Sequence, residues 1–169
     1  TDTVQLAQVR LNSKIDGSHK DMTLDIPHYM SANIEGKYNI TEVVDVVNNS
    51  LVDLIPSFRK KNVSKNQEFS FDILVQNNLL KYIDPSIVIQ TNTHLKGTID
   101  GNKNELDASL NTPGISYAGI QLFQSDVNLN TIAELPTLNA KVDSLKVGGV
   151  SINDINIVSN PKNDTMIVK

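Results

Sequence analysis

The chain has 169 residues, of which 15 are Lys or Arg and 19 are Asp or Glu, so its net charge is −4 and its isoelectric point is near 5.3. This balance excludes the basic surface of a typical nucleic-acid-binding protein, and the lack of cysteine excludes disulfides and thiolate metal sites. Aromatic residues make up only 5% and Trp is absent, which favours repetitive β-structure built from Ile, Val and Leu.

Three strands are predicted before residue 39. Apolar and polar residues alternate over residues 4–15, 22–26 and 32–38, the period of a strand with one dry face. The parity of the first run shifts after Leu6, which predicts a bulge. Asp16-Gly17-Ser18 is a typical hairpin turn.

A helix is predicted next, over residues 41–55. Asn39 and Glu42 match the spacing of a capping box, and Pro56 ends the pattern. The β-branched residues lower intrinsic helicity, so we expect the helix to depend on docking its apolar stripe onto the sheet. The side chains expected to cover the sheet are Val43, Val47, Leu51 and Leu54.

A polar connection over residues 57–68 follows the helix. It holds the basic cluster of Arg59, Lys60 and Lys61, which is either a solvated loop or a contact for anionic head groups. Residues 69–75 alternate again and predict a strand, and residues 77–83 predict a single helical turn that ends at Asp84-Pro85.

A meander of strands is predicted from Ile87 to Leu129, with further strands over 138–147, 150–157 and 166–168. The turn signals are Asp100-Gly101, Pro113-Gly114 and Ala118-Gly119. The apolar face of this meander is expected to carry Ile87, Ile89, Leu95, Ile99, Leu106, Leu110, Ile115 and Tyr117.

The predicted fold class is mainly β, an antiparallel meander with one amphipathic helix and one short helix. We expect a single segment, 1–169, divided into strands plus helix (1–56), the polar connection (57–68) and the meander (69–169). A meander with one dry face can close into a barrel, fold over as a sandwich or curl into a half-pipe. The period of two does not choose among these.

No catalytic constellation is evident. The three histidines are scattered, and the sequence has no HExxH motif, nucleophile elbow or phosphate-binding loop. Asp100, Asn102 and Asn104 have the spacing of a calcium loop, but Glu105 replaces the required Gly and Asn111 the final Glu. We therefore expect a hairpin turn there, no metal, no cofactor and no enzyme activity.

Several stretches resemble the TamB proteins of the AsmA-like group, in the form found in Bacteroidetes-type bacteria. They are THLKGTIDGNKNELDASLNTPGISYAGIQL, DSLKVGGVSINDINI, NDTMIV and NIEGKYNITEVVDVVNNSLVDLIPSF, which together cover most of the chain. The resemblance implies a half-pipe (β-taco) whose apolar groove shields lipid acyl chains. It also implies a periplasmic protein that moves phospholipid toward the outer membrane and assists assembly of outer-membrane barrel proteins.

The resemblance further implies partners and an anchor. The expected partners are phospholipid acyl chains, an outer-membrane barrel protein and neighbouring repeats of the same chain. The sequence has no bilayer-spanning apolar run and no signal-peptide pattern at Thr1, so we expect an excised segment whose inner-membrane anchor lies elsewhere.

Other readings of the apolar face remain open. It could be the core of a closed β-sandwich used in binding or adhesion, or the sheet could receive substrate strands at an open edge, as a chaperone for outer-membrane proteins. Exposed edges also predict self-association of this segment.

Overall fold

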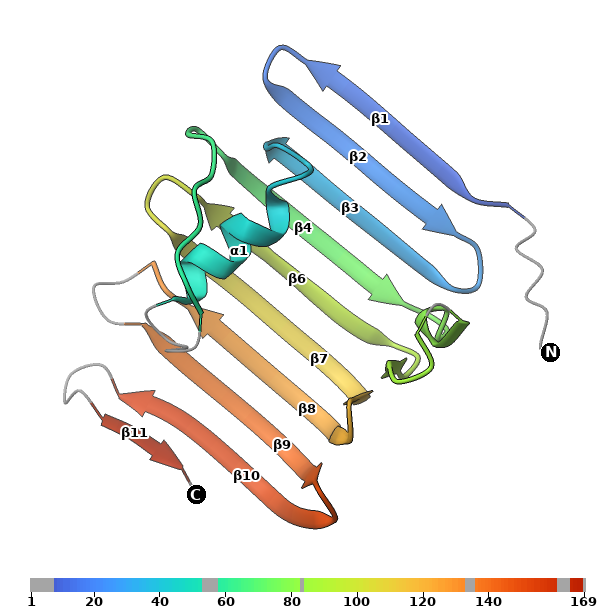
Figure 1. The fold of residues 1–169 in the computed structure, drawn as a ribbon, viewed down its shortest axis with the longest axis vertical. Helices are drawn as coiled ribbons and strands as arrows, with labels where there is room; N and C mark the ends of the chain where they lie inside the picture. The colour runs from blue at the N-terminus through green and yellow to red at the C-terminus, as the bar shows by residue number, and fades with distance from the viewer. Residues whose placement is uncertain (1–7, 53–57, 83, 133–135, 161–164, 169) are drawn as a thin grey trace.

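The structure, a computed structural model, describes residues 8–52, 58–82, 84–132, 136–160 and 165–168 (Figure 1). Helix α1 covers Val43–Leu51, and a single 3-10 turn, η1, covers Leu80–Tyr82. The strands are β1 (Arg10–Asp16), β2 (His19–Ile26), β3 (Met30–Lys37), β4 (Glu68–Val75), β5 (Val88–Ile89), β6 (Thr93–Asp100), β7 (Glu105–Tyr117), β8 (Ile120–Asn130), β9 (Thr137–Val147), β10 (Val150–Asn160) and β11 (Thr165–Val168).

The strands form one antiparallel sheet in which successive strands lie side by side. Their order is β1-β2-β3-β4-β6-β7-β8-β9-β10-β11, and the short β5 pairs with β7. Because β1 and β11 lie at opposite ends of this order, the sheet is open rather than closed into a barrel (Figure 1). The predicted fold class is confirmed: a mainly β meander with one amphipathic helix and one short helix, consistent with a curled sheet.

The register places apolar residues in rows that cross the whole sheet. Each strand pairs with the next without a slip, so residues two apart on one strand share a face with their partners on the other. We call the face that carries these rows, and helix α1, the inner face. One row contains Leu11, Leu24, Ala32, Ile73, Leu95, Leu110, Val127, Ala140 and Ile157, and the next contains Met22, Ile34, Phe71, Gly97, Ala108, Leu129 and Leu138.

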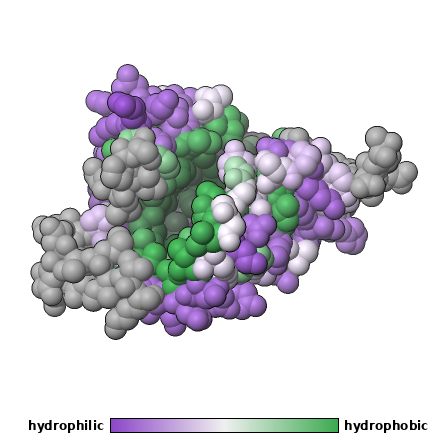
Figure 2. Space-filling view, turned by 60° about the horizontal axis from the view of Figure 1, so that its bottom comes forward, coloured by the Kyte–Doolittle hydropathy of each residue, from purple (hydrophilic) through white to green (hydrophobic). Residues whose placement is uncertain are grey.

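The opposite, outer face is polar. One of its rows contains Asn12, Thr23, Asn33, Asp72, Lys96, Ser109, Asn128 and Asn139. The abundant Asn of the sequence therefore serves the wet side of the sheet as well as its turns. Figure 2 shows the result, a hollow lined by hydrophobic side chains within a hydrophilic exterior.

Two glycines let phenylalanine rings lie across neighbouring strands of the inner face. Gly36 pairs with Phe69, and Gly97 pairs with Phe71. A Cβ atom on Gly97 would stand 2.7 Å from the Phe71 ring and 2.4 Å from the Asp107 carbonyl oxygen. Gly36 has φ +136°, where other residues are strained. Neither position has room for a Cβ atom, because atoms of the neighbouring strands already occupy that space.

Helix α1 lies across the inner face, in front of β4, β6 and β7 (Figure 1). Its N-cap is Glu42, which makes no side-chain capping bond, so the predicted capping box is wrong. Instead, Asn39 Oδ1 accepts bonds from the N–H and hydroxyl of Thr41. The predicted positions Leu54 and Pro56 lie outside the described residues.

The stretch from Ile87 to Ile99 is not one uninterrupted strand, as the alternation had suggested. β5 and β6 follow one another along β7, but Ile89 pairs with Ile115 and His94 with Asn111. Four residues therefore oppose three, and Asn92 turns with φ +65°. This extra residue breaks the common parity expected for Ile87, Ile89, Leu95 and Ile99.

A second irregularity crosses the later strands. The apolar residues of β7 to β10 change parity at one level of the sheet, between Leu110 and Ile115 in β7 and between Ile152 and Ile155 in β10. At this level Gln124 and Asp154 have φ of +40° and +55°. A residue outside the extended region interrupts the alternation of side chains, which accounts for the change in β8 and β10.

The predicted first strand, over residues 4–15, begins in the structure at Arg10, and the bulge predicted after Leu6 lies outside the described residues. The strands predicted at 22–26, 32–38 and 69–75 correspond to β2, β3 and β4. Asp16 pairs with His19 across the Gly17-Ser18 turn, so the predicted hairpin is confirmed.

Candidate functional site: an apolar groove beside helix α1

A cavity of about 510 Å³ lies between the inner face and helix α1. It extends across the sheet from β1 to β8 and falls within the range of roughly 300–1,000 Å³ typical of small-molecule sites. In the described chain, Asn33 and Ser109 are the only polar residues that border it, and both belong to the row of the sheet that faces outward. The apolar ones are Leu11, Met22, Leu24, Ala32, Ile34, Val43, Val47, Leu51, Phe69, Phe71, Ile73, Leu95, Leu106, Ala108, Leu110, Val127 and Leu129. We call this cavity the groove (Figure 2).

Helix α1 closes one margin of the groove by forming a small core with the sheet. Val46 is only 1% exposed and packs with Tyr38, Phe69, Ile99 and Leu106. The Tyr38 and Phe69 rings are tilted with centroids 5.7 Å apart, a favourable aromatic arrangement. The helix thus covers the part of the inner face near the β6–β7 turn and leaves the neighbouring rows uncovered.

Hydrogen bonds hold the helix to the connection over residues 58–67. The Asn49 side chain pairs with the backbone of Lys61 in both directions, donating to its carbonyl oxygen at 2.9 Å and accepting from its N–H at 2.7 Å. The Asn48 amide donates to the Arg59 carbonyl oxygen at 2.9 Å. Two neighbouring side chains of the helix thus bond to the backbone of the connection, which therefore runs alongside the helix.

Glu42 adds a second contact between the start of the helix and the connection. Its carboxylate accepts bonds from the Ser64 N–H at 2.8 Å, the Ser64 hydroxyl at 3.0 Å and the Gln67 amide at 2.8 Å. The Ser64 backbone bond, foremost among these contacts, lowers the pKa of Glu42. The carboxylate is therefore engaged in structure rather than aimed into the groove.

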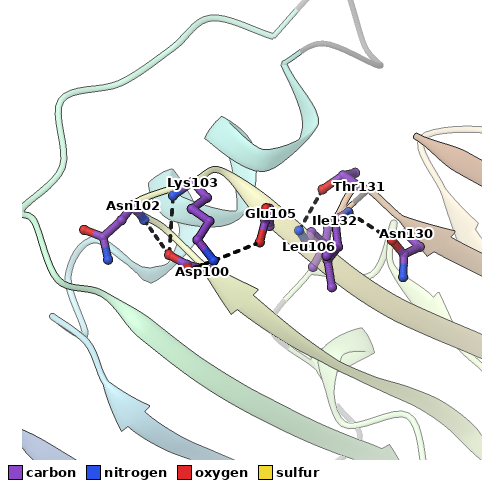
Figure 3. Close-up of polar contacts among 8 residues, drawn as sticks. All are labelled: Asp100, Asn102, Lys103, Glu105, Leu106, Asn130, Thr131 and Ile132. Carbon is purple, nitrogen blue, oxygen red and sulfur yellow. Dashed lines mark hydrogen bonds and ion pairs between the residues drawn. The ribbon is translucent and has the colours of Figure 1, made fainter. Parts of the chain in front are cut away.

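The β6–β7 turn explains the calcium-like spacing (Figure 3). Asp100 accepts bonds from the backbone N–H groups of Asn102 and Lys103, and Lys103 Nζ lies 3.1 Å from Asp100 and 3.6 Å from Glu105. Partial burial raises the pKa of Asp100, but the bonds from Lys103 and Asn102 outweigh it and leave the pKa below its ordinary value. A hairpin turn with an internal ion pair, as predicted, thus occupies these carboxylates.

Thr131 fixes the end of β8 against β7 beside this turn. Its hydroxyl accepts the Leu106 N–H at 2.7 Å, and its own N–H donates to the Leu106 carbonyl oxygen at 2.8 Å (Figure 3). Leu106 is 3% exposed and contacts both the helix core and the groove. The turn therefore positions the residue at which core and groove meet.

The eight residues predicted to line the groove fall into three places. Leu95, Leu106 and Leu110 line it, whereas Ile99 is buried with the helix core. Ile87, Ile89, Ile115 and Tyr117 lie outside it, beyond the interruption at Asn92, and Tyr117 is 55% exposed. Of the predicted helix residues, Val43, Val47 and Leu51 line the groove, and Leu54 lies outside the described residues.

The sequence-based prediction missed most of the lining. Residues from the first strands, including Met22, Leu24, Ile34, Phe71 and Ile73, contribute as much of it as the later meander. The signal that identifies them is the same alternation, carried across the turns without a slip of register. The alternation that begins in β1, rather than at Ile87, marks the whole apolar face.

Ionisable pairs lie away from the groove, on the outer face. His94 Nε2 is 2.8 Å from the Asp72 carboxylate, and His19 Nε2 is 3.3 Å from that of Glu35. Within the described ranges, no cluster of three or more His, Asp or Glu side chains has the geometry to hold a metal ion. In the same ranges, neither helix has the length and hydropathy needed to cross a bilayer.

Comparison of the chain with protein-family models, with curated proteins and with solved structures found no match. The fold and the groove are therefore the observations from which a function is argued.

Proposed function

We propose that the groove shields the acyl chains of lipids. The observation that carries this proposal is a cavity of about 510 Å³, walled by hydrocarbon side chains, that the described chain does not fill itself. Transferring apolar surface out of water is favourable by roughly 25 cal/mol per Å², so an exposed face of this kind favours an apolar ligand. The mechanism is passive shielding and uses no catalytic residue.

The wider role rests on the resemblance to TamB and other AsmA-like proteins. In this proposal the chain is a periplasmic segment of an envelope-spanning protein, anchored in the inner membrane by a segment outside it. The groove joins those of neighbouring repeats into a path for phospholipid toward the outer membrane. An outer-membrane barrel protein is the proposed partner at the far end.

Mass spectrometry under native conditions tests the proposal. Protein purified without detergent is expected to carry phospholipid and to bind Nile red, a neutral apolar dye. Ala108→Phe, which places a ring in the groove, should abolish both, whereas Ser70→Phe on the outer face should change neither. Lipid-free protein that also fails to bind the dye would contradict acyl-chain shielding.

A second candidate function is the reception of a substrate strand at the edge of β1. Among the described residues this strand pairs only with β2, and all seven of its residues are exposed, with Leu11 at 64% and Ile15 at 65%. Such an edge can add a strand from another chain, including a second copy of this one. Ile15→Lys, at a β1 position that does not line the groove, should block strand addition, measured as peptide binding or dimer formation, and spare dye binding.

A further inference from the structure

A charge stands on the otherwise uncharged inner face, at the end of the groove. In the described parts of β1 to β6, Lys20 is the single ionisable residue at an inward-facing position. It lies two residues along β2 from Met22, which lines the groove. A charge on a dry face requires compensation, so its surroundings indicate what it meets.

Lys20 lies beside the ring of Tyr38, a residue of the small core under helix α1. Nζ is 5.6 Å from the ring centroid and donates one bond, at 2.8 Å, to the Tyr38 carbonyl oxygen. An ammonium has three donors, so two are free for another acceptor. This placement, an apolar stem against the wall and a charged end at the boundary with water, is common for lysine at apolar surfaces.

Two further lysines join it in a second cavity. This cavity, of about 440 Å³, is lined by Lys20, Lys37 and Lys65 and by neutral residues of the β1–β2 turn, of the segment after β3 and of the connection, such as Tyr38 and Gln67. None of the described lining residues is acidic, although Lys37 lies opposite Glu68 in the sheet and the Glu42 carboxylate is bonded to Ser64 and Gln67 at the margin of the cavity. Among the described residues, the three lysines make no ion pair. The cavity is therefore a concentration of lysine side chains on a chain whose net charge is −4.

We infer that this lysine pocket binds the anionic head group, a carboxylate or a phosphate, of the lipid whose acyl chain occupies the groove. The inference rests on the proposed function and narrows it to anionic amphiphiles. Charge complementarity supports it, because lysine ammonium groups form strong charge-assisted bonds with both acceptors. The groove and the pocket share no lining residue, but Met22 of the groove and Lys20 of the pocket lie two residues apart on the same side of β2, so a lipid that occupies both sites would follow this strand past Tyr38.

Displacement of Nile red by three single-chain ligands tests the inference. Oleate and monooleoyl glycerophosphate carry the two candidate anions, and oleyl alcohol carries none. In wild-type protein both anions should bind at least about tenfold more tightly than the alcohol. In the variant Lys20→Gln, Lys37→Gln, Lys65→Gln the anions should lose about tenfold in affinity and the alcohol should be unchanged. The anion whose affinity falls more identifies the head group, carboxylate or phosphate, that the pocket binds.

The controls separate failure of this inference from failure of the proposed function. Lys14→Gln, Lys96→Gln, Lys141→Gln removes the same charge from the outer face and should leave all three affinities unchanged. Equal binding of oleate and oleyl alcohol to wild-type protein would overturn the head-group site and leave the groove standing. If no ligand displaces the dye, both proposals fail. Should the triple variant not fold, Lys65→Gln alone, on the connection, should weaken the anions about threefold.

Discussion

The inner face of the sheet contains two apolar regions, one packed as core under helix α1 and one that lines the open groove. Under helix α1, Ile99 and Leu106 are buried to 2% and 3% exposure and pack with Val46. One or two rows away, Leu95 and Leu110 belong to the same strands and the same face but line an unfilled groove. Alternation therefore determines which side of a strand is dry, and the covering element determines whether that side becomes core or binding surface.

The two regions also differ in how they are secured. The covered region is surrounded by polar contacts to backbone, including those of Asn49, Glu42 and Thr131. The groove has apolar walls, in which the Phe71 ring occupies the space over Gly97. Substitutions in each region should accordingly have different consequences.

The largest expected difference is between two leucines on paired strands. Leu106→Ala should lower the free energy of unfolding by about 3 kcal/mol, because it leaves a hole in a packed core. Leu95→Ala should lower it by only about 1 kcal/mol, since the neighbouring space is already unfilled. Urea denaturation of lipid-free protein measures both. Equal losses would mean that the groove is as tightly packed as the core.

Filling the groove from the sheet side should have the next largest effect. Gly97→Val places side-chain atoms against Phe71 and the Asp107 carbonyl oxygen, and overpacking of this kind costs about 2 kcal/mol. The variant should also lose dye binding. Thr98→Val, one residue along and on the outer face, should stay within about 0.5 kcal/mol of wild type and bind dye normally. Dye binding retained by Gly97→Val would place the ligand elsewhere.

The attachment of the helix should contribute less. Asn49→Ala removes both bonds to Lys61 and should destabilise the protein by about 1 kcal/mol, whereas Asn48→Ala removes the single bond to Arg59 and should cost about 0.5 kcal/mol. Thermal denaturation followed by circular dichroism distinguishes them. Because the helix also covers one margin of the groove, Asn49→Ala should increase dye binding. A decrease would contradict the role of the helix as a cover.

The smallest expected effect concerns pH. The pKa of Asp100 is lowered in the folded protein, so its contribution to stability is present above the unfolded pKa of about 3.9 and is lost as pH falls through the folded value. The bond to Asp100, with the charge of Glu105, raises the pKa of Lys103, so that contribution persists until pH rises through its folded value. Lys103→Met should therefore lower Tm by about 1 °C at pH 7. The two proteins should converge near pH 2.

The alternation of the sequence predicted most strands, the helix and the single dry face, because each depends on local spacing. The turn predicted at Pro113-Gly114 was wrong, since both residues lie inside β7. The alternation did not predict the interruption at Asn92, because one extra residue between two short apolar runs leaves the alternation within each run unchanged. The partners of Glu42 were also missed. The local pattern suggested a capping box between Asn39 and Glu42. Glu42 instead bonds to Ser64, which lies 22 residues away and is brought close by the return of the connection.

The site was predicted in kind but not in extent. Leu95, Leu106, Leu110 and the helix stripe were identified because they combine apolar character with the right period. Period alone did not separate them from Ile115 and Tyr117, whose position depends on backbone angles later in the strands. Lys20 had no local signal, because an isolated lysine in a strand becomes unusual only when the register shows which way it faces.

The unbroken register has a consequence for how this sheet can change in length. A single-residue insertion near the start of β7 would turn every following side chain of that strand to the opposite side, exchanging Leu110 for Ser109 in the wall of the groove. Two residues would preserve the sides. The Gly17-Ser18 turn protrudes into open space and has no such constraint. Indels within the strands should therefore be tolerated in even numbers, and those in the turns in any number.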